Sequence, residues 1–183
     1  MSLLLVDELV FAPPMACLSA EFFIIKTPWK IAVDMKVSFH GDRVIAVELG
    51  VFSPEELKSQ AHQIPKWKQE IENRLQGRWT HPLRFSLNGT PFQQKVWMQL
   101  CRIEWSENFS YSEVAEKIGH SNATRAVANA IGANRFAGFI PCHRVLPKAG
   151  GVGGYRWGTA LKKSMLSYES SSKKPILLVR WDL

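Results

Sequence analysis

Apolar residues in the first half of the chain gather at positions 22–51, a stretch rich in β-branched and aromatic side chains. Turn-forming residues interrupt it at positions 27–29 and 40–43, which is typical of short antiparallel strands joined by hairpins. The segment 81–89 is predicted to be a connection, with a domain boundary near residue 86. The pattern therefore predicts an α+β fold with a short antiparallel sheet in its first half.

Between these parts, residues 53–78 have the pattern of a helix. Ser53 is placed as the N-cap, Pro54 occupies the first helical position, and Glu56 completes a capping box. Pro65 is expected to divide the helix into two pieces.

The second half changes to compact helices with clear start and stop signals. One helix is predicted to start at Thr90, with Pro91 in its first turn and Gln93 completing a capping box. Four apolar residues of this segment recur at the helical period, so the helix is predicted to bury one face. They are Phe92, Val96, Leu100 and Ile103.

Two shorter helices follow and are joined by a tight turn. The first is predicted to start at Ser110, which pairs with Glu113 in a capping box, and to end at Gly119. The second is predicted to be capped by Ser121 and closed by Gly132. Two short helices joined in this way predict a helix-turn-helix unit.

The second of these helices is unusually rich in alanine. A slim helix can approach a nucleic-acid groove closely, but the same composition also suits a helix packed tightly against its neighbours. Arg125 is its one long cation, and the two interpretations place it either in a surface pair or inserted into DNA. The alanines are Ala123, Ala126, Ala128 and Ala130.

The charge distribution separates the two halves. The net charge of the 183-residue chain is +7, and residues 86–183 hold the whole excess, because they contain 13 basic and 6 acidic side chains. A basic half suggests a polyanion such as nucleic acid, although a solvated surface would look the same.

Cysteines and apolar runs limit the class of protein further. The three cysteines are too few and too widely spaced for a disulfide framework or a structural zinc site, and they favour a reducing compartment. Asp7 and Glu8 interrupt the apolar N-terminus, so we expect neither a signal peptide nor a membrane span. A soluble, intracellular protein without a structural zinc site is expected.

Candidate chemistry lies in the stretch "IPCHRVL", residues 140–146, where Cys142 precedes His143. Only the thiolate is a strong nucleophile, and a neighbouring histidine can accept the thiol proton directly or through water. Glu169 is the best candidate to orient that histidine. Burial in a core is nevertheless the usual fate of a lone cysteine.

The segment "GGVGGYRWG", residues 150–158, contains five glycines in nine positions. Such a loop can bring its backbone close to a planar ligand, on which Tyr155 and Trp157 could stack.

Taken together, these motifs resemble the O6-alkylguanine-DNA alkyltransferases, also called methylated-DNA–protein-cysteine methyltransferases. The resemblance covers about 80 residues, in matching order and spacing. It is carried by "GTPFQQKVW" (89–97), "YSEVA" (111–115), "RAVANA" (125–130), Asn134, "IPCHRV" (140–145), "GGYRWG" (153–158) and "KKSMLSYE" (162–169).

The resemblance implies a repair protein that is consumed in a single turnover and that needs no cofactor. Cys142 would take the alkyl group from O6 of guanine, and from O4 of thymine, after the nucleotide has been flipped out of the duplex. His143 would activate the thiol through water, and Glu169 would orient the histidine. Tyr111 would press on the target phosphate or donate to N3 of guanine, and Asn134 would bind backbone beneath the site.

The resemblance also implies a DNA-binding set and a substrate pocket. Arg125 would fill the space left by the flipped nucleotide, entering from the minor groove. Residues 1–85 would form an N-terminal α/β, ribonuclease H-like domain, and residues 86–183 the alkyltransferase domain. The remaining DNA contacts implied are Tyr111, Ala126, Ala130 and Arg144, and the pocket residues are Tyr155, Trp157 and Val145.

Double-stranded DNA containing O6-alkylguanine is then the expected partner of a monomeric protein. It would be cytoplasmic or nucleoid-associated, or nuclear in a eukaryote. The chain departs from the family pattern at Arg135, where many relatives have proline, and at Trp157, where some have glycine. Since Trp157 narrows the pocket, O6-benzyl groups are expected to react more slowly than O6-methyl groups.

Three alternatives stay open at this point. A binding protein of the same fold could recruit other repair factors without transfer, although such relatives replace the cysteine. A transcription regulator would leave Cys142, His143 and Glu169 unexplained. A cysteine hydrolase would turn over repeatedly and would not need a basic half.

Overall fold

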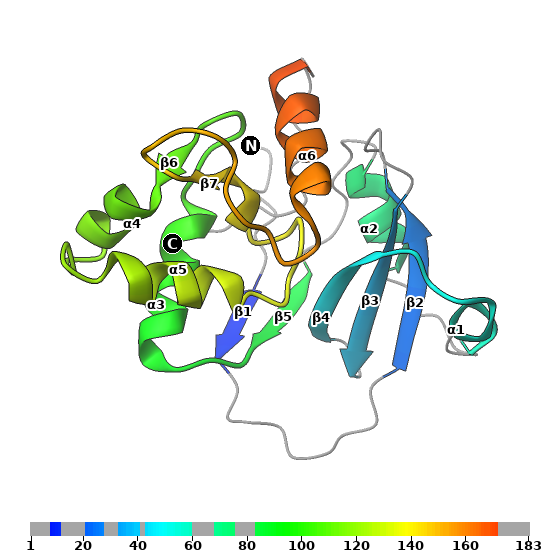
Figure 1. The fold of residues 1–183 in the computed structure, drawn as a ribbon. Helices are drawn as coiled ribbons and strands as arrows, with labels where there is room; N and C mark the ends of the chain where they lie inside the picture. Colours follow the sequence, from blue (N-terminus) through cyan, green and yellow to red (C-terminus); the bar gives the residue numbers. More distant parts are fainter. Residues whose placement is uncertain are drawn as a thin grey trace, which may run out of the picture. The chain divides into compact units, whose positions relative to one another are not determined.

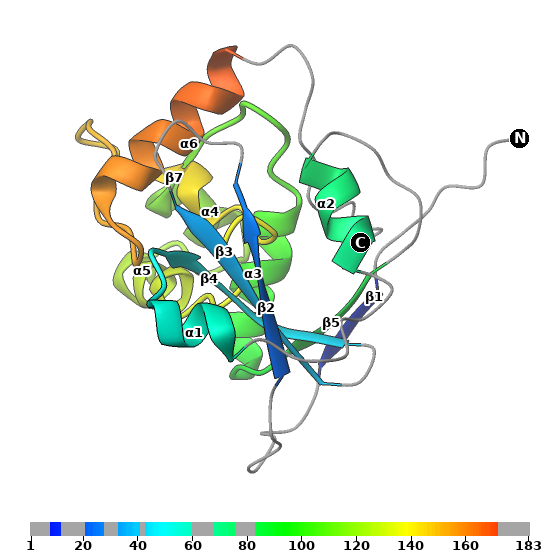
Figure 2. The same cartoon turned by 90° about the vertical axis from the view of Figure 1, so that its right-hand side faces the viewer.

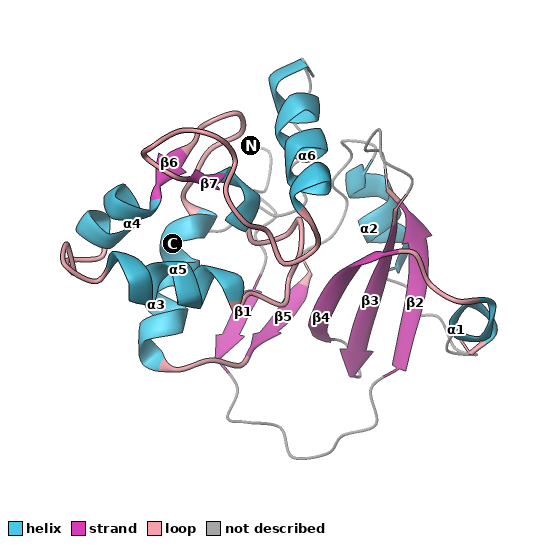
Figure 3. Ribbon diagram, viewed as in Figure 1, coloured by secondary structure: helices cyan, strands magenta, loops and turns pink. Residues whose placement is uncertain are grey.

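The computed structural model describes residues 8–11, 21–27, 33–40, 43–59, 68–75 and 83–171. The chain divides into two compact units. The first comprises residues 1–28, 32–88 and 174–182, and the second residues 29–31, 89–173 and 183. Figures 1 and 3 show the elements of each unit.

A five-stranded sheet forms the first unit, with its strands in the order β1-β5-β4-β3-β2. Strands β2, β3 and β4 are antiparallel, as predicted, whereas β1 pairs with β5 and β5 pairs with β4 in parallel. Figure 2 shows the strands from the side. Their bounds are Glu8–Phe11 for β1, Glu21–Lys26 for β2, Asp34–His40 for β3, Arg43–Gly50 for β4 and Arg84–Leu87 for β5.

Strand β5 corrects the prediction of a simple connection at residues 81–89. Its four residues are too short to show a strand period, yet Phe85, Ser86 and Leu87 are buried in the sheet. Alternating residues of β3 are also buried, and Met35 and Val37 have no exposed surface. The sheet is therefore mixed rather than purely antiparallel.

Helices of the first unit follow the predicted capping. Helix α1 (Pro54–Lys58) begins with the Ser53–Glu56 capping box and Pro54 at its start. Helix α2 spans Lys68–Leu75, and the predicted break at Pro65 lies outside the described residues.

The second unit is mainly helical. It contains α3 (Pro91–Cys101), β6 (Phe109–Ser110), α4 (Tyr111–Lys117), α5 (Thr124–Gly132), a 3-10 turn η1 (Cys142–Arg144), β7 (Val145–Leu146) and α6 (Thr159–Ser171). Helix α3 packs on α4 and α5, while α6 packs on η1. The two short strands β6 and β7 pair in parallel.

Both predicted capping boxes of this unit are present. Thr90 and Gln93 cap α3, and Ser110 and Glu113 cap α4. Gly119 has φ +75°, a left-handed conformation that ends α4 without steric cost. The four apolar residues predicted for one face of α3 include three that are buried and Phe92, which is half-buried.

The cap predicted for α5 is wrong. The N-cap is Ala123, which makes no side-chain cap hydrogen bond, and Ser121 lies two residues earlier in the turn. The helix is held by packing instead, because Val127, Ala130 and Ile131 are buried on one side. The indole of Trp97 on α3 also donates to the carbonyl of Ala130 at 2.8 Å.

Candidate active site around Cys142

Cys142 begins the tight 3-10 turn η1, directly after Pro141. Its backbone N–H donates to the carbonyl of Ile140 at 2.7 Å, and the N–H of Arg144 donates to Pro141 at 3.1 Å. These bonds fix the direction of the cysteine side chain. Cys142 is only 4% exposed and His143 2%, so both reactive groups are largely withdrawn from bulk water.

Asn134 supports this turn from beneath. Its Nδ2 group donates to the carbonyl of Ile140 at 3.2 Å and to Sγ of Cys142 at 3.1 Å. Its Oδ1 accepts from the backbone N–H of Phe136 at 2.9 Å. The buried amide therefore binds backbone on both sides of the chain reversal and also touches the sulfur, a contact that sequence reasoning had not specified.

Glu169 reaches the turn from α6 and binds two side chains at once. Its Oε1 lies 2.8 Å from Nε2 of His143 and 2.9 Å from Nη2 of Arg144. Burial raises the pKa of Glu169, but hydrogen bonds and charge from His143 and Arg144 outweigh this and hold it below its usual range. Glu169 is therefore a carboxylate, which fixes the proton of His143 on Nε2.

Arg144 was expected to contact DNA, and the structure corrects this. Its guanidinium is buried, donating from Nε and Nη2 to Glu169 and from Nη1 to the carbonyl of Ile103 at 2.7 Å. The plane of Trp105 lies against it, with 5.5 Å between Cζ and the ring centre. The hydrogen bonds of this buried arginine therefore connect η1 with α6 and with the segment directly after α3.

A cavity of about 500 Å³ opens at Cys142. Tyr111 from α4 and Tyr155 and Trp157 from the glycine-rich loop form its walls, so with Cys142 the structure brings together residues predicted from three separate motifs. The rings of Tyr155 and Trp157 meet edge to face, 5.2 Å apart. The full lining is Tyr111, Ala128, Ile131, Gly132, Cys142, Gly154, Tyr155, Arg156 and Trp157.

The other residues predicted for the pocket or for DNA contact do not line this cavity. Val145 is fully buried in β7 and does not line this cavity, so its assignment to the pocket is wrong. Ala130 is 2% exposed and faces the core, which removes it as a groove contact. Arg125 and Ala126 are exposed on α5.

Burial is the main influence on the titratable groups. It raises the pKa of the Cys142 thiol above its ordinary value near 9, although hydrogen bonds from Asn134 and Tyr155 and the charge of Lys162 act in the opposite direction. Burial also lowers the pKa of His143, against the effect of Glu169. At neutral pH the resting pair is therefore a thiol beside a neutral imidazole.

Nδ1 of His143 is the atom left to act as a base. Because Nε2 is held by Glu169, the lone pair of the neutral ring lies on Nδ1. Nδ1 is buried and has no hydrogen-bond partner within the described part of the chain. Burial raises the pKa of both Tyr111 and Tyr155, which keeps their hydroxyls protonated as possible donors.

Lys162 is a buried cation that sequence reasoning missed. It is 1% exposed, and its Nζ donates to the carbonyls of Val145 at 2.7 Å and Gly154 at 3.4 Å. Burial lowers its pKa to about 8. The signal that could have found it is its spacing to Met165 and Glu169, since all three lie on the buried face of α6.

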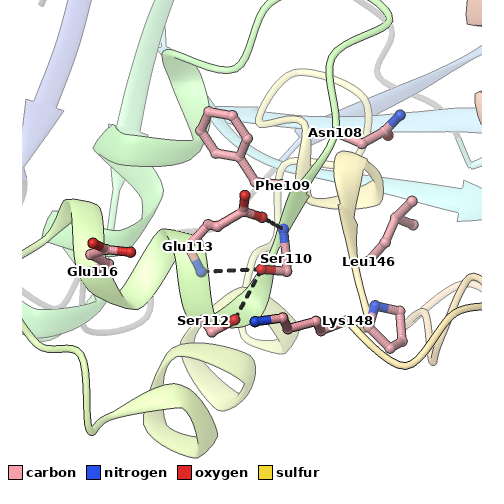
Figure 4. Close-up of a pocket in the computed structure, with 9 residues that line it drawn as sticks. Asn108, Phe109, Ser110, Ser112, Glu113, Glu116, Leu146 and Lys148 are labelled. Atoms are coloured by element: carbon pink, nitrogen blue, oxygen red, sulfur yellow. Dashed lines mark hydrogen bonds between the residues drawn. The ribbon is translucent and has the colours of Figure 1, made fainter.

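A second hollow, of about 440 Å³, lies beside β6, β7 and the start of α4. Figure 4 shows that its polar groups bind one another: Ser110 accepts from the N–H of Glu113 and also contacts Ser112. The Glu113 carboxylate accepts from the N–H of Ser110. Those groups form the cap of α4, and Cys142 does not line this hollow.

The described segments contain neither a metal-ligand cluster nor a membrane-spanning helix. Within them, no group of three or more His, Cys, Asp or Glu side chains could hold a metal ion. None of their helices combines the length and the apolar character that crossing a bilayer requires.

The sequence and the fold resemble those of known proteins. The model of the family described as "6-O-methylguanine DNA methyltransferase, DNA binding domain" matches residues 91–171. The methylated-DNA–protein-cysteine methyltransferase of Lodderomyces elongisporus is 45% identical over 106 residues, which are 56% of this chain and 52% of that protein. The constitutive enzyme of that name from Bacillus subtilis is 41% identical over 109 residues, 58% of this chain and 66% of its own.

A solved structure extends the similarity to both units. The crystal structure of Mycobacterium tuberculosis OGT in complex with DNA matches with a TM-score of 0.67 and 30% identity, covering 86% of this chain and 98% of that one. The chain spans about half to two thirds of the length of the two curated relatives named. These similarities define a class of DNA alkyltransferases. This chain belongs to the methylated-DNA–protein-cysteine methyltransferase family.

Proposed function

We propose that this protein repairs DNA by moving the alkyl group of O6-alkylguanine, or of O4-alkylthymine, to the sulfur of Cys142. The observation that carries the proposal is the cavity in which Cys142 meets Tyr111 and Tyr155, backed by the buried His143–Glu169 pair. A planar base fits between aromatic walls, and the cavity volume lies within the usual range for small-molecule sites.

The transfer balances without a cofactor. The sulfur attacks the alkyl carbon, the new C–S bond forms, and the C–O bond breaks with its electron pair staying on guanine. The thiol proton passes to Nδ1 of His143, directly or through water, while Glu169 stabilises the resulting imidazolium. Tyr111, whose hydroxyl stays protonated, can donate to N3 of the departing guanine.

The product is a thioether, which has no easy leaving group, so each chain reacts once. Because the resting thiol is protonated, its proton must be removed before or during the attack. A protonated thiol is a weak nucleophile, which protects the sulfur from other electrophiles until then.

Helices α4 and α5 with their connecting turn supply the proposed helix-turn-helix. A base in a duplex is out of reach of Cys142 until it is extruded, at a cost of a few kcal/mol. Arg125 is exposed near the start of α5 and can take the vacated place from the minor groove. Ala126 is exposed and small, which allows close approach to the sugar-phosphate backbone.

Phosphate contacts dominate the affinity of such proteins, so binding should tolerate any sequence and weaken with salt. We further propose a monomer that acts where the DNA is, in the cytoplasm or nucleoid, or in the nucleus of a eukaryote.

Intact mass measurement tests the proposal. The protein is incubated with a duplex oligonucleotide containing O6-methylguanine, and a gain of one methyl group per chain is expected. Cys142→Ala, which should still bind the duplex, should gain none. Binding without a mass gain would instead favour a recruiting protein, and more than one guanine restored per chain would favour a hydrolase.

A further inference from the structure

Arg156 lies at the tip of a turn that forms one side of the Cys142 cavity. The turn is closed by the N–H of Gly158, which donates to the carbonyl of Tyr155 at 3.0 Å. Gly158 has φ +96°, a conformation that other residues rarely adopt. This geometry places Arg156 and Trp157 at the two central positions, from which both line the cavity.

The guanidinium of Arg156 reaches across to the last residue of α5. Its Nη1 donates to the carbonyl of Gly132 at 3.2 Å. Carbonyls at the end of a helix have no partner within the helix, and a cation there also complements the helix dipole. Gly132 itself lines the cavity, so this hydrogen bond joins its two sides.

The inner part of the same loop is held by different groups. Lys162 donates to the carbonyl of Gly154, and the hydroxyl of Tyr155 contacts Sδ of Met165 at 3.6 Å. Both anchors lie on α6, beneath the cavity. The tip of the turn, with Trp157, is tied to α5 through Arg156.

We propose that Arg156 is a specificity-determining clasp: by holding the turn against the end of α5 it fixes the outer wall of the cavity and limits the size of the O6 substituent that Cys142 accepts. The role rests on the proposed function and adds to it. Arg156 acts by positioning Tyr155 and Trp157, not by touching the reacting atoms. Loss of the hydrogen bond between Arg156 and Gly132 should admit bulky O6 substituents to the cavity without speeding the transfer of small ones.

The test compares two duplex oligonucleotides that differ only in carrying O6-methylguanine or O6-benzylguanine. Single-turnover rates are measured from the mass gain of the intact protein, for the unaltered chain and for Arg156→Ala. The benzyl-to-methyl rate ratio should rise about threefold to tenfold, the factor that one exposed hydrogen bond contributes to an equilibrium constant. Arg102→Ala removes an equal charge from an exposed site outside this cavity and should leave the ratio unchanged.

Free O6-benzylguanine separates the clasp from a contact with DNA. Because the free base has no phosphate, the clasp predicts faster reaction of Arg156→Ala with it as well. Slower reaction with both duplexes and an unchanged rate with the free base would overturn the clasp in favour of a phosphate contact. Equal slowing of every substrate would overturn it in favour of a purely structural role.

Arg156→Gln provides a second variant in case the alanine protein does not fold, since it shortens the donor and removes the charge. Its benzyl-to-methyl ratio should also rise, and an unchanged ratio in a folded protein contradicts the proposal. If the unaltered chain gains no alkyl group from either duplex, the proposed function itself fails and the clasp falls with it.

Discussion

Replacing Arg144 with alanine should damage the fold and leave the electrostatics of DNA binding intact. In the structure this arginine is 6% exposed, and three of its N–H groups have protein acceptors. Nε and Nη2 donate to the carboxylate of Glu169, and Nη1 donates to the carbonyl of Ile103. The substitution would leave a buried carboxylate with His143 as its remaining partner and a buried carbonyl with none.

The expected loss can be sized from this geometry. Removing one partner of a buried ion pair costs about 3–5 kcal/mol, because the other charge stays behind without compensation. Typical domains are stable by about 5–15 kcal/mol, so the loss is a large fraction of the total. The double substitution Arg144→Met with Glu169→Met should recover part of it, since it removes both charges together.

Urea unfolding followed by tryptophan fluorescence measures the loss of stability. A salt titration of duplex binding tests whether the electrostatic contribution to DNA affinity is unchanged. Arg144→Ala should lower the unfolding midpoint strongly while the slope of log affinity against log salt stays unchanged. Arg125→Ala should instead weaken duplex binding with little effect on stability, because Arg125 is exposed on α5 and is proposed to fill the place of the flipped nucleotide. A loss below about 1 kcal/mol with a reduced salt slope would refute the internal role of Arg144.

Three further predictions concern stability. Above pH 9 the unaltered protein should lose stability against urea relative to Cys142→Ala. The reason is that burial raises the pKa of the Cys142 thiol, so the thiol stays protonated in the folded chain while it ionises in the unfolded chain. A difference in unfolding free energy between the two proteins that stays constant from pH 8 to 10 would contradict this. Gly153→Ala should cost about 1–3 kcal/mol in the same assay, since φ is +67° and a Cβ would lie 2.8 Å from Cγ of Pro147. Gly154→Ala, which meets nothing within 4 Å, is its control, and equal midpoints would exclude the strain. Asn134→Ala should cost roughly 2–6 kcal/mol by calorimetry, because two buried backbone groups lose their partners; a loss near zero would show that the turn is held otherwise.

Local signals in the sequence were enough to predict α3 and α4 of the second unit. Capping boxes at Thr90 and Ser110 are interactions over three residues, so they can be recognised without knowing the fold. Helix α5 shows the limit of this approach. Ser121 had the right residue type for a cap, but the start of α5 is set by packing of its apolar side, which local patterns do not encode.

The strands of the first unit were predicted less completely for a related reason. Strand β5 has four residues and pairs with partners about 40 and 76 positions earlier in the chain, so no short-range pattern reveals it. Parallel pairing of β1 with β5 depends on the same long-range arrangement.

At the site, residue types were predicted better than their surroundings. Cys142, His143 and Glu169 meet around η1, but their order in the sequence could not show that Arg144 is buried between α3 and α6. Nor could it show that burial would raise the pKa of the thiol, because that depends on side chains from several elements. Lys162 was missed because a lysine on a helix usually faces solvent.

Transfer of a labelled methyl group tests the central claim most directly. The protein is mixed with a duplex carrying O6-[13C]methylguanine, and the methyl resonance is followed by NMR. We predict a single S-methyl signal per chain, with nuclear Overhauser contacts to the rings of Tyr111 and Tyr155, and no such signal in Cys142→Ala. A label that stays on guanine, or that appears on the partly exposed Cys101, would contradict the assignment of Cys142 as the alkyl acceptor.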